Sequence, residues 1–277
     1  MIKSHLNILI PQWQGGGQDL STYEGGLEIK NNYFRGLELT EAEVETEKIE
    51  DTRNNIFGYD AILKQLKNAK ARIAENRPKT IFTIGGGCDA DVTSMSYLNS
   101  LAAGDMTLLY FDAHGDMNTP ESSGSKCFYG MSLRTLLGDG DRRFIDSLFS
   151  TLSPSQIIML GVRDLDKAEA DYIKDKSVNV LTVDEIEKDT ENVINSVREK
   201  GSGNIYIHID LDVLDPEEFP FVPVPVQGGL GNDTLIKLLK RLSEEFTVCG
   251  LGILEYSPSG GEENSVVREI VDMGRNL

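Results

Sequence analysis

The sequence has little of several features that mark particular classes of protein. It holds three cysteines among 277 residues, too few for a disulfide framework, so we expect a reducing, cytoplasmic location. No hydrophobic run is long enough to cross a membrane, and the first residues lack the apolar core of a signal peptide. The 27 basic residues are outnumbered by 45 acidic ones, for a net charge of −18. This deficit of positive charge argues against nucleic acids and anionic membranes as partners.

The composition that remains is that of an ordinary globular chain, with 39% hydrophobic and 26% charged residues. Expected strands alternate with expected helices along it, which predicts a mostly parallel sheet with helices on both faces, in one domain spanning 1–277. Residues 14–26 are expected to form a loop, and the acidic stretch 40–55 either a solvated helix or a linker. Strands are expected at 6–10, 80–84, 107–111, 156–162, 178–183, from 205 and at 247–254, and helices at 59–76, 92–103, 129–137, 184–200, 235–246 and 266–273.

The stretch TLLYFDAHGDMNTP, residues 107–120, carries the first candidate site. After an apolar run it presents Asp112, His114 and Asp116 at alternate positions, which share one face of an extended chain. Burying two carboxylates together is unfavourable without a cation, and carboxylate with imidazole suits Mn, Zn or Fe. The alternative is a loop in which these acids cap backbone amides.

A second apolar strand ends in the same way, in IYIHIDLDVLDP, residues 205–216. His208, Asp210 and Asp212 lie on one of its faces. If the two strands are neighbours in a parallel sheet, four Asp residues meet at its carboxyl edge, where α/β sheets bind ligands. Four acids suit two divalent cations, a known hydrolytic arrangement. His208 is either a further metal ligand or a hydrogen-bonded core residue, and we favour the core residue.

A third segment, GGGCDADV at 85–92, permits a different hypothesis. Gly85, Gly87 and Ala90 match the glycine pattern of dinucleotide-binding turns, so a nucleotide-binding α/β protein is one alternative. The pattern requires only a tight strand-to-helix turn. It also leaves the clustered acids unexplained.

Four segments, in this order, resemble the ureohydrolases, the arginase, agmatinase and formiminoglutamase family: GGGCDADV (85–92), DAHGDMNTP (112–120), HIDLDVLDP (208–216) and LEYSP (254–258). A fifth, GVRDLDKAE (161–169), is similar to the arginase segment near the α-amino and carboxylate groups of the substrate. The resemblance implies a three-layer α-β-α sandwich, a trimer or hexamer, and a hydrolase of linear amidines. It also implies two divalent ions, with Mn expected first.

The resemblance also implies roles for individual residues. Asp112 and Asp210 would bridge the two metals, Asp116 and Cys88 would complete one site, and His114 and Asp212 the other. A hydroxide between the metals would attack the carbon of a small cationic guanidino or formimino compound. Asp116 would pass a proton to the leaving amine, and Glu255 would hold the guanidinium. The remaining expected substrate contacts are Asn118, Ser123, Asp166 and Glu169.

The chain departs from the family pattern at three places. Cys88 stands where the family usually has a metal-ligating His, which favours Zn or Fe there, or no ligand at all. Tyr129 replaces the His of an HG pair, and residues 223–225 replace a polar T-G-T with Pro-Val-Pro. These departures motivate another alternative, a catalytically impaired member that serves as a structural or regulatory metal-binding protein.

Overall fold

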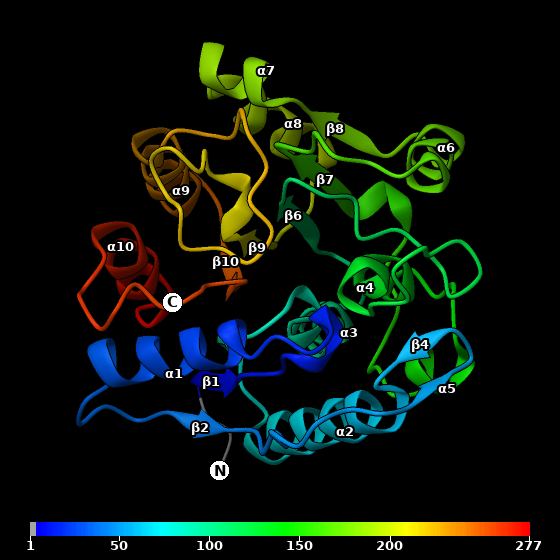
Figure 1. Ribbon diagram of the computed structural model, residues 1–277. Coiled ribbons are helices and arrows are strands. Elements are labelled where there is room, and N and C mark those ends of the chain that lie inside the picture. The colour runs from blue at the N-terminus through cyan, green and yellow to red at the C-terminus, as the bar shows by residue number, and fades with distance from the viewer. Residues whose placement is uncertain (1–3) are drawn as a thin grey trace.

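The computed structural model describes residues 4–277 and is built on an eight-stranded sheet in which every pairing is parallel (Figure 1). The strand order is β2-β1-β5-β10-β9-β6-β7-β8, and β3 (Thr52–Arg53) and β4 (Ile56–Phe57) form a separate antiparallel pair. The strands of the large sheet are β1 (His5–Ile10), β2 (Thr40–Glu41), β5 (Thr80–Gly85), β6 (Thr107–Phe111), β7 (Ile157–Leu160), β8 (Asn179–Leu181), β9 (Ile205–Asp210) and β10 (Val248–Leu254).

Helices cover both faces of this sheet, and each face has its own buried cluster of hydrophobic residues. Leu108 and Tyr110 of β6 belong to one cluster and Leu109 and Phe111 to the other, because successive strand residues point to opposite faces. The predicted three-layer α-β-α sandwich is therefore confirmed. One face carries α2 (Tyr59–Asn76), α3 (Val92–Leu101), α4 (Ser132–Leu136), α5 (Arg142–Ile145) and α6 (Lys167–Lys176); the other carries α1 (Ser21–Tyr33), α7 (Val183–Lys188), α8 (Glu191–Lys200), α9 (Asn232–Glu245) and α10 (Ser265–Gly274).

The loop expected over 14–26 was wrong, because α1 begins at Ser21. Two glycines in that helix, Gly25 and Gly26, favour a loop on local propensity. The fold needs the first of them for contact: a β-carbon on Gly25 would overlap the backbone carbonyl oxygen of Tyr256, which follows β10. Packing against that loop, rather than intrinsic preference, thus explains the glycine.

The acidic stretch 40–55 is a linker, and its helical alternative was wrong. It is irregular apart from the short strands β2 and β3 and a turn at Asn54 and Asn55, and side chains of the preceding segment hold it in place. Trp13 Nε1 and Gln14 Nε2 both donate to the carbonyl oxygen of Glu45, at 2.9 and 2.7 Å.

The single helix expected over 184–200 is two helices, since Asp189 has an extended backbone.

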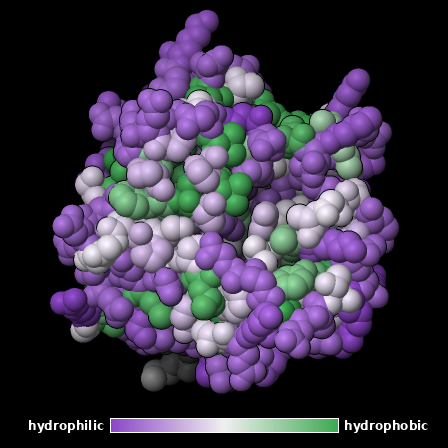
Figure 2. All heavy atoms as spheres, in the orientation of Figure 1, coloured by the Kyte–Doolittle hydropathy of each residue, from purple (hydrophilic) through white to green (hydrophobic). Residues whose placement is uncertain are grey.

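The surface in the view of Figure 2 is mostly hydrophilic, with small hydrophobic areas scattered over it. No helix among residues 4–277 combines the length and the apolar character needed to span a bilayer.

Candidate metal centre and active site

Four neighbouring strands of the sheet deliver the candidate site residues to one edge. In the order β5-β10-β9-β6, their carboxyl ends lead to Cys88, Glu255, Asp210 and Asp112. These residues are almost 170 positions apart in the sequence at the extremes, yet the parallel topology places them together. All four are nearly inaccessible, with exposed fractions of 1%, 6%, 3% and 0% respectively.

The first donor group is formed by Asp112, His114 and Asp212. His114 Nδ1 lies 2.8 Å from Asp212 Oδ2 and 3.6 Å from Asp112 Oδ1. The backbone orients both acids, since the amide of His114 donates to Asp112 and the amide of Ala113 donates to Asp212, at 2.6 and 2.9 Å. The structure thus brings together three of the predicted metal ligands.

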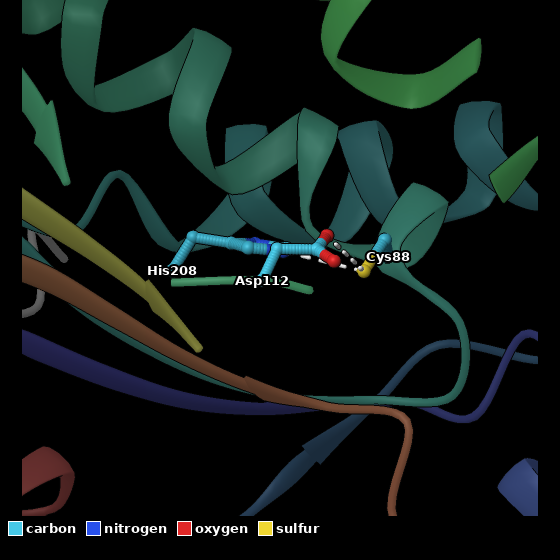
Figure 3. A group of neighbouring side chains, drawn as sticks. All are labelled: Cys88, Asp112 and His208. Carbon is cyan, nitrogen blue, oxygen red and sulfur yellow. Dashed lines mark hydrogen bonds between the residues drawn. The ribbon is translucent and has the colours of Figure 1, made fainter. Parts of the chain in front are cut away.

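The second donor group surrounds Cys88, which opens the short 3-10 helix η2 (Cys88–Ala90) after β5. Its Sγ lies 3.0 Å from Asp210 Oδ2, 3.8 Å from Asp112 Oδ2 and 3.4 Å from His208 Nε2. Figure 3 shows Cys88, Asp112 and His208 pointing toward one another from three different elements. Asp112 therefore belongs to both donor groups, as expected of a residue that bridges two ions.

Asp116 lies at the same edge but outside both donor groups. Its Oδ2 accepts hydrogen bonds from Tyr110 Oη at 2.6 Å and Ser132 Oγ at 3.1 Å. Its backbone φ is 51°, a left-handed conformation that turns the chain after His114. The predicted role of Asp116 as metal ligand and proton donor stays a prediction.

The buried acids of the site carry negative charge that a bound cation would balance. Burial and the nearby carboxylates raise the pKa values of Asp112, Asp210 and Glu255 well above the ordinary range. Burial alone would lower the pKa of His114, but the Asp112 and Asp212 carboxylates outweigh it and raise that pKa to about 12. Within residues 4–277, no Lys or Arg side chain forms an ion pair with these acids. Oxygen, nitrogen and sulfur donors around uncompensated buried acids fit divalent metal ions.

Glu255 follows β10 and faces a cavity of about 200 Å³. Its Oε1 accepts a hydrogen bond from the backbone amide of Cys88 at 3.3 Å. Its backbone φ of 57° is left-handed, and its amide donates to Gly86 at 2.8 Å. Tyr129, which replaces the expected His, and Val224 of the proline-rich loop line the same cavity, so two of the departures lie next to the predicted guanidinium ligand.

Three predicted substrate ligands, Asn118, Asp166 and Glu169, line a second cavity of about 170 Å³, which is also lined by His114, Asp116 and Tyr129. Asn118 Nδ2 donates to Asp166 Oδ2 at 2.9 Å. Glu169 accepts from the amides of Met117 and Asp166, each at 2.9 Å, and its second bond caps the start of α6. These three residues therefore have structural partners as well as a place at the cavity.

Ser123 is the predicted substrate ligand that the structure does not bring to either cavity. Its Oγ accepts from the amide of Lys126 at 3.0 Å within a polar turn. Ser125, two residues later, lines the 170 Å³ cavity instead. Substrate contact by Ser123 stays a prediction.

Arg163 forms no ion pair with the nearby acids in the part of the chain that the structure describes. Its guanidinium donates to backbone carbonyl groups only, including those of Asp212 at 2.7 Å and Val226 at 2.7 Å. It fastens the proline-rich loop to the end of β9. Backbone contacts of this kind leave no signal in a sequence.

Sequence reasoning missed two supporting residues, Asp91 and Tyr110. Both are fully buried behind the cluster: Asp91 accepts from His208 Nδ1, and the Tyr110 ring stacks on that imidazole with centroids 4.0 Å apart. Tyr110 shares the face of Asp112 by simple alternation, so its position was readable in principle. Asp91 could not be identified, because the sequence does not distinguish it from the other acid of the GGGCDADV turn.

The nucleotide hypothesis loses its basis in this arrangement. The turn after β5 places Asp89 and Asp91, both fully buried, at the start of α3, where a pyrophosphate would have to lie. Their carboxylates would repel that group.

Comparison with known proteins agrees with this fold and site. Residues 19–274 match the family model described as the arginase family. An arginase from Staphylococcus aureus (strain MRSA252) is 30% identical over 239 residues, covering 83% of this chain and 78% of the relative. Two solved structures share the fold: an arginase from Entamoeba histolytica in complex with L-ornithine (TM-score 0.85, 21% identity, 98% and 97% covered) and a formimidoylglutamase from Bacillus subtilis (TM-score 0.74, 19% identity, 98% and 85% covered). The chain therefore belongs to the arginase family.

Proposed function

We propose that the chain is a hydrolase that cleaves a C–N bond of a guanidino or formimino compound and releases urea or the corresponding amide. Family membership supports a ureohydrolase-type enzyme. The observation that carries the proposal is the convergence of Asp112, Asp210 and Asp212 with His114 at one buried edge.

Two divalent ions would be held by these residues. Asp112, His114 and Asp212 would hold one ion, and Cys88, with the Asp112 and Asp210 carboxylates near its Sγ, would hold the other, with Asp116 at the same edge. Manganese suits the oxygen and nitrogen donors, and Zn or Fe suits the thiol. When bound, such ions supply positive charge that lowers the pKa of water and polarises the reacting carbon.

Three residues would act on the substrate directly. Glu255 faces the 200 Å³ cavity and would accept charge-assisted hydrogen bonds from the guanidinium. Burial raises the pKa of Asp116, despite the opposing bond from Tyr110, so this carboxyl is suited to hold the proton that the leaving amine needs. The acidic cavity with Asp166 would receive a second positive charge on the substrate.

We also propose a homo-oligomer, a trimer or hexamer, and a cytoplasmic location. Both follow from the family resemblance and the sparse cysteines. Mass measurement in solution and fractionation of expressing cells test them separately from the chemistry.

An assay of metal content and product release tests the proposed function. Protein purified without chelator is analysed for bound metals and then incubated with Mn or Zn before arginine, agmatine, guanidinobutyrate or formiminoglutamate is added. We expect about two ions per chain and release of urea or formamide from one substrate. Bound metal with no product from any of the four would contradict the substrate class.

A catalytically impaired member remains the second candidate, and Tyr129 favours it. Its side chain borders both cavities at the place where the family pattern has a His. The same assay separates the two candidates, because an impaired member would bind metal without turnover. If Tyr129→His then restores turnover, Tyr129 is the cause.

A further inference from the structure

The imidazole of His208 is a feature that the proposed chemistry does not use. It lies on β9, two residues before Asp210, and is completely buried. Its Nε2 faces Cys88 Sγ at 3.4 Å and its Nδ1 faces Asp91 Oδ2 at 2.9 Å. The chain thus has a buried imidazole beside Cys88, which stands where the family usually has a metal-ligating histidine.

Asp91 fixes the orientation of that imidazole. Its other oxygen accepts from Tyr206 Oη at 2.5 Å, so the carboxylate has two donors. Because a carboxylate accepts hydrogen bonds, Nδ1 is the donor in that bond, and Nε2, the other ring nitrogen, faces Cys88 Sγ. Carboxylate behind imidazole is the arrangement that orients histidine ligands in metal sites.

The neighbouring elements are shaped around this pair. A β-carbon on Gly252 of β10, which pairs with His208 in the sheet, would overlap the Asp91 carboxylate. The Tyr110 ring lies parallel to the imidazole, at an interplanar angle of 5°. The plane of His208 is therefore held from one side by a ring and from its edge by a carboxylate.

The spacing of the donors matches coordination of a common ion. Two ligands on a tetrahedral zinc ion, with Zn–S of about 2.3 Å and Zn–N of about 2.0 Å, have a sulfur–nitrogen separation of about 3.5 Å. The observed Sγ–Nε2 distance is 3.4 Å. The Asp112 carboxylate completes a group whose ligand atoms all lie within 4.8 Å of one another, and Figure 3 shows it.

We propose that Cys88 and His208 together ligate the ion of the second donor group, which makes that group a zinc site, with carboxylate oxygens of Asp112 and Asp210. The first donor group, with Asp112, His114 and Asp212, has only oxygen and nitrogen donors and accepts manganese. The two positions are therefore chemically unequal. The inference rests on the proposed two-metal function but concerns only how the ion beside Cys88 is bound.

The alternative is that His208 merely hydrogen-bonds to the thiol, and ligand spectroscopy separates the two. Metal-free protein is titrated with Zn or with Co. With one equivalent of Zn, X-ray absorption should show one sulfur at about 2.3 Å and at least one nitrogen at about 2.0 Å. With Co, a thiolate-to-metal charge-transfer band should appear in the near ultraviolet. Absence of sulfur from the wild-type zinc shell would overturn the proposal without any variant.

Variants then assign the ligands. Cys88→Ser should remove the charge-transfer band, whereas Cys249→Ser, the matched control in β10, should keep it. His208→Gln should lower the affinity for the first equivalent of zinc at least 100-fold and reduce the number of nitrogen ligands on that zinc. Asp91→Asn should lower the same affinity about 10–100-fold. An unchanged nitrogen count and affinity in His208→Gln would show that His208 is not a ligand.

Failure of this inference is distinguishable from failure of the proposed function. Turnover of a guanidino substrate without sulfur in the zinc shell would refute the zinc site and keep the hydrolase. Sulfur and imidazole on zinc without turnover of any tested substrate would keep the site and refute the hydrolase.

Discussion

At the scale of single residues, Asp112 is the residue that the donor group of His114 shares with a donor group of Cys88. It is completely buried and belongs to the groups of both His114 and Cys88. Replacing it should therefore affect two ions, whereas replacing a residue of one group should affect one.

Metal content of two variants tests this difference. We expect Asp112→Asn to lower bound metal from about two ions per chain to almost none, because both positions lose a charged oxygen. Cys88→Ser should keep one ion, in the group of His114 and Asp212. Plasma emission analysis of protein purified without chelator gives both numbers. Equal losses in the two variants would contradict separate positions.

The perturbed titrations predict how stability depends on pH. The carboxyls of Asp112, Asp210 and Glu255 have raised pKa values in the folded chain. Their contribution to the free energy of unfolding is therefore fully present below their unfolded pKa of about 4, and it is lost as the pH rises. The contribution of His114 to the free energy of unfolding is fully present below its unfolded pKa of about 6.5, and it is lost as the pH rises through its folded pKa of about 12.

Both contributions have the same sign in metal-free protein. Its free energy of unfolding, measured with denaturant after chelation, should fall by roughly 1 kcal/mol or more per pH unit between about 5 and about 8. Added metal replaces the protons, so the stabilisation by metal should grow with pH. Metal stabilisation that shrinks as pH rises would contradict buried, uncompensated acids.

Cys88 and His208 also predict an energetic coupling. An imidazole at position 88 is larger than the thiol and meets His208, which lies 3.4 Å from Sγ. Cys88→His alone should therefore cost about 1–3 kcal/mol of stability by overpacking. The double variant with His208→Ser should cost less than the sum of the two single changes, measured by denaturant unfolding. Strict additivity would show that the two positions do not compete for space.

Much of this residue-level picture was readable from the sequence. Alternation predicted that Asp112 and His114 lie together, as they do, but it did not predict that Asp116 turns away to Tyr110 and Ser132. The engagement of Glu169 with backbone amides was not readable, because a capping carboxylate and a substrate-binding carboxylate look alike in a sequence. The same holds for Arg163, which bonds to backbone carbonyl groups.

At the scale of elements, α1 packs against the loop after β10 that carries Glu255. Its Gly25 packs against the carbonyl oxygen of Tyr256, the residue after Glu255. The adjacent Gly26 has room for a methyl group, because its nearest neighbours would be 3.4 Å away. The two glycines therefore form a matched pair for substitution.

Alanine substitutions at Gly25 and Gly26 should change the free energy of unfolding in opposite directions. Gly25→Ala should destabilise the protein by about 1–3 kcal/mol and lower kcat by displacing Glu255. Gly26→Ala should be neutral or stabilising by up to about 1 kcal/mol, since alanine favours a helix. Thermal unfolding and turnover of both variants check this. A tolerated Gly25→Ala would mean that the contact is not required.

Long periodic elements such as α2 and the strands of the sheet other than β2 were predictable from hydrophobic spacing. The start of α1 and the break between α7 and α8 were not. Gly25 reflects a contact over 230 residues away, and the break depends on the backbone conformation of Asp189. Local propensity carries neither kind of information.

At the scale of the whole molecule, the strand order is what assembles the site. The motifs at 85–92, 112–120, 208–216 and 254–258 meet because β5, β10, β9 and β6 are neighbours. Alternating strands and helices predicted a parallel sheet, but the strand order was not predicted, since periodicity does not say which strands pair.

The net charge of the chain predicts how the rate of substrate association depends on salt. A chain of net charge −18 attracts cations over a distance that salt shortens. The kcat/KM for dicationic agmatine should fall several-fold between about 10 mM and about 500 mM salt. The value for guanidinobutyrate, which has no net charge, should change less. Equal salt dependence for both would contradict electrostatic attraction.

The central claim is that carboxylates from separate strands are gathered here around divalent cations. Anomalous diffraction from crystals grown with Mn and Zn tests it most directly. The account predicts two peaks, one among Asp112, His114 and Asp212 and one among Cys88, Asp112 and Asp210. A map with no anomalous peak among these side chains, at saturating metal, would contradict it.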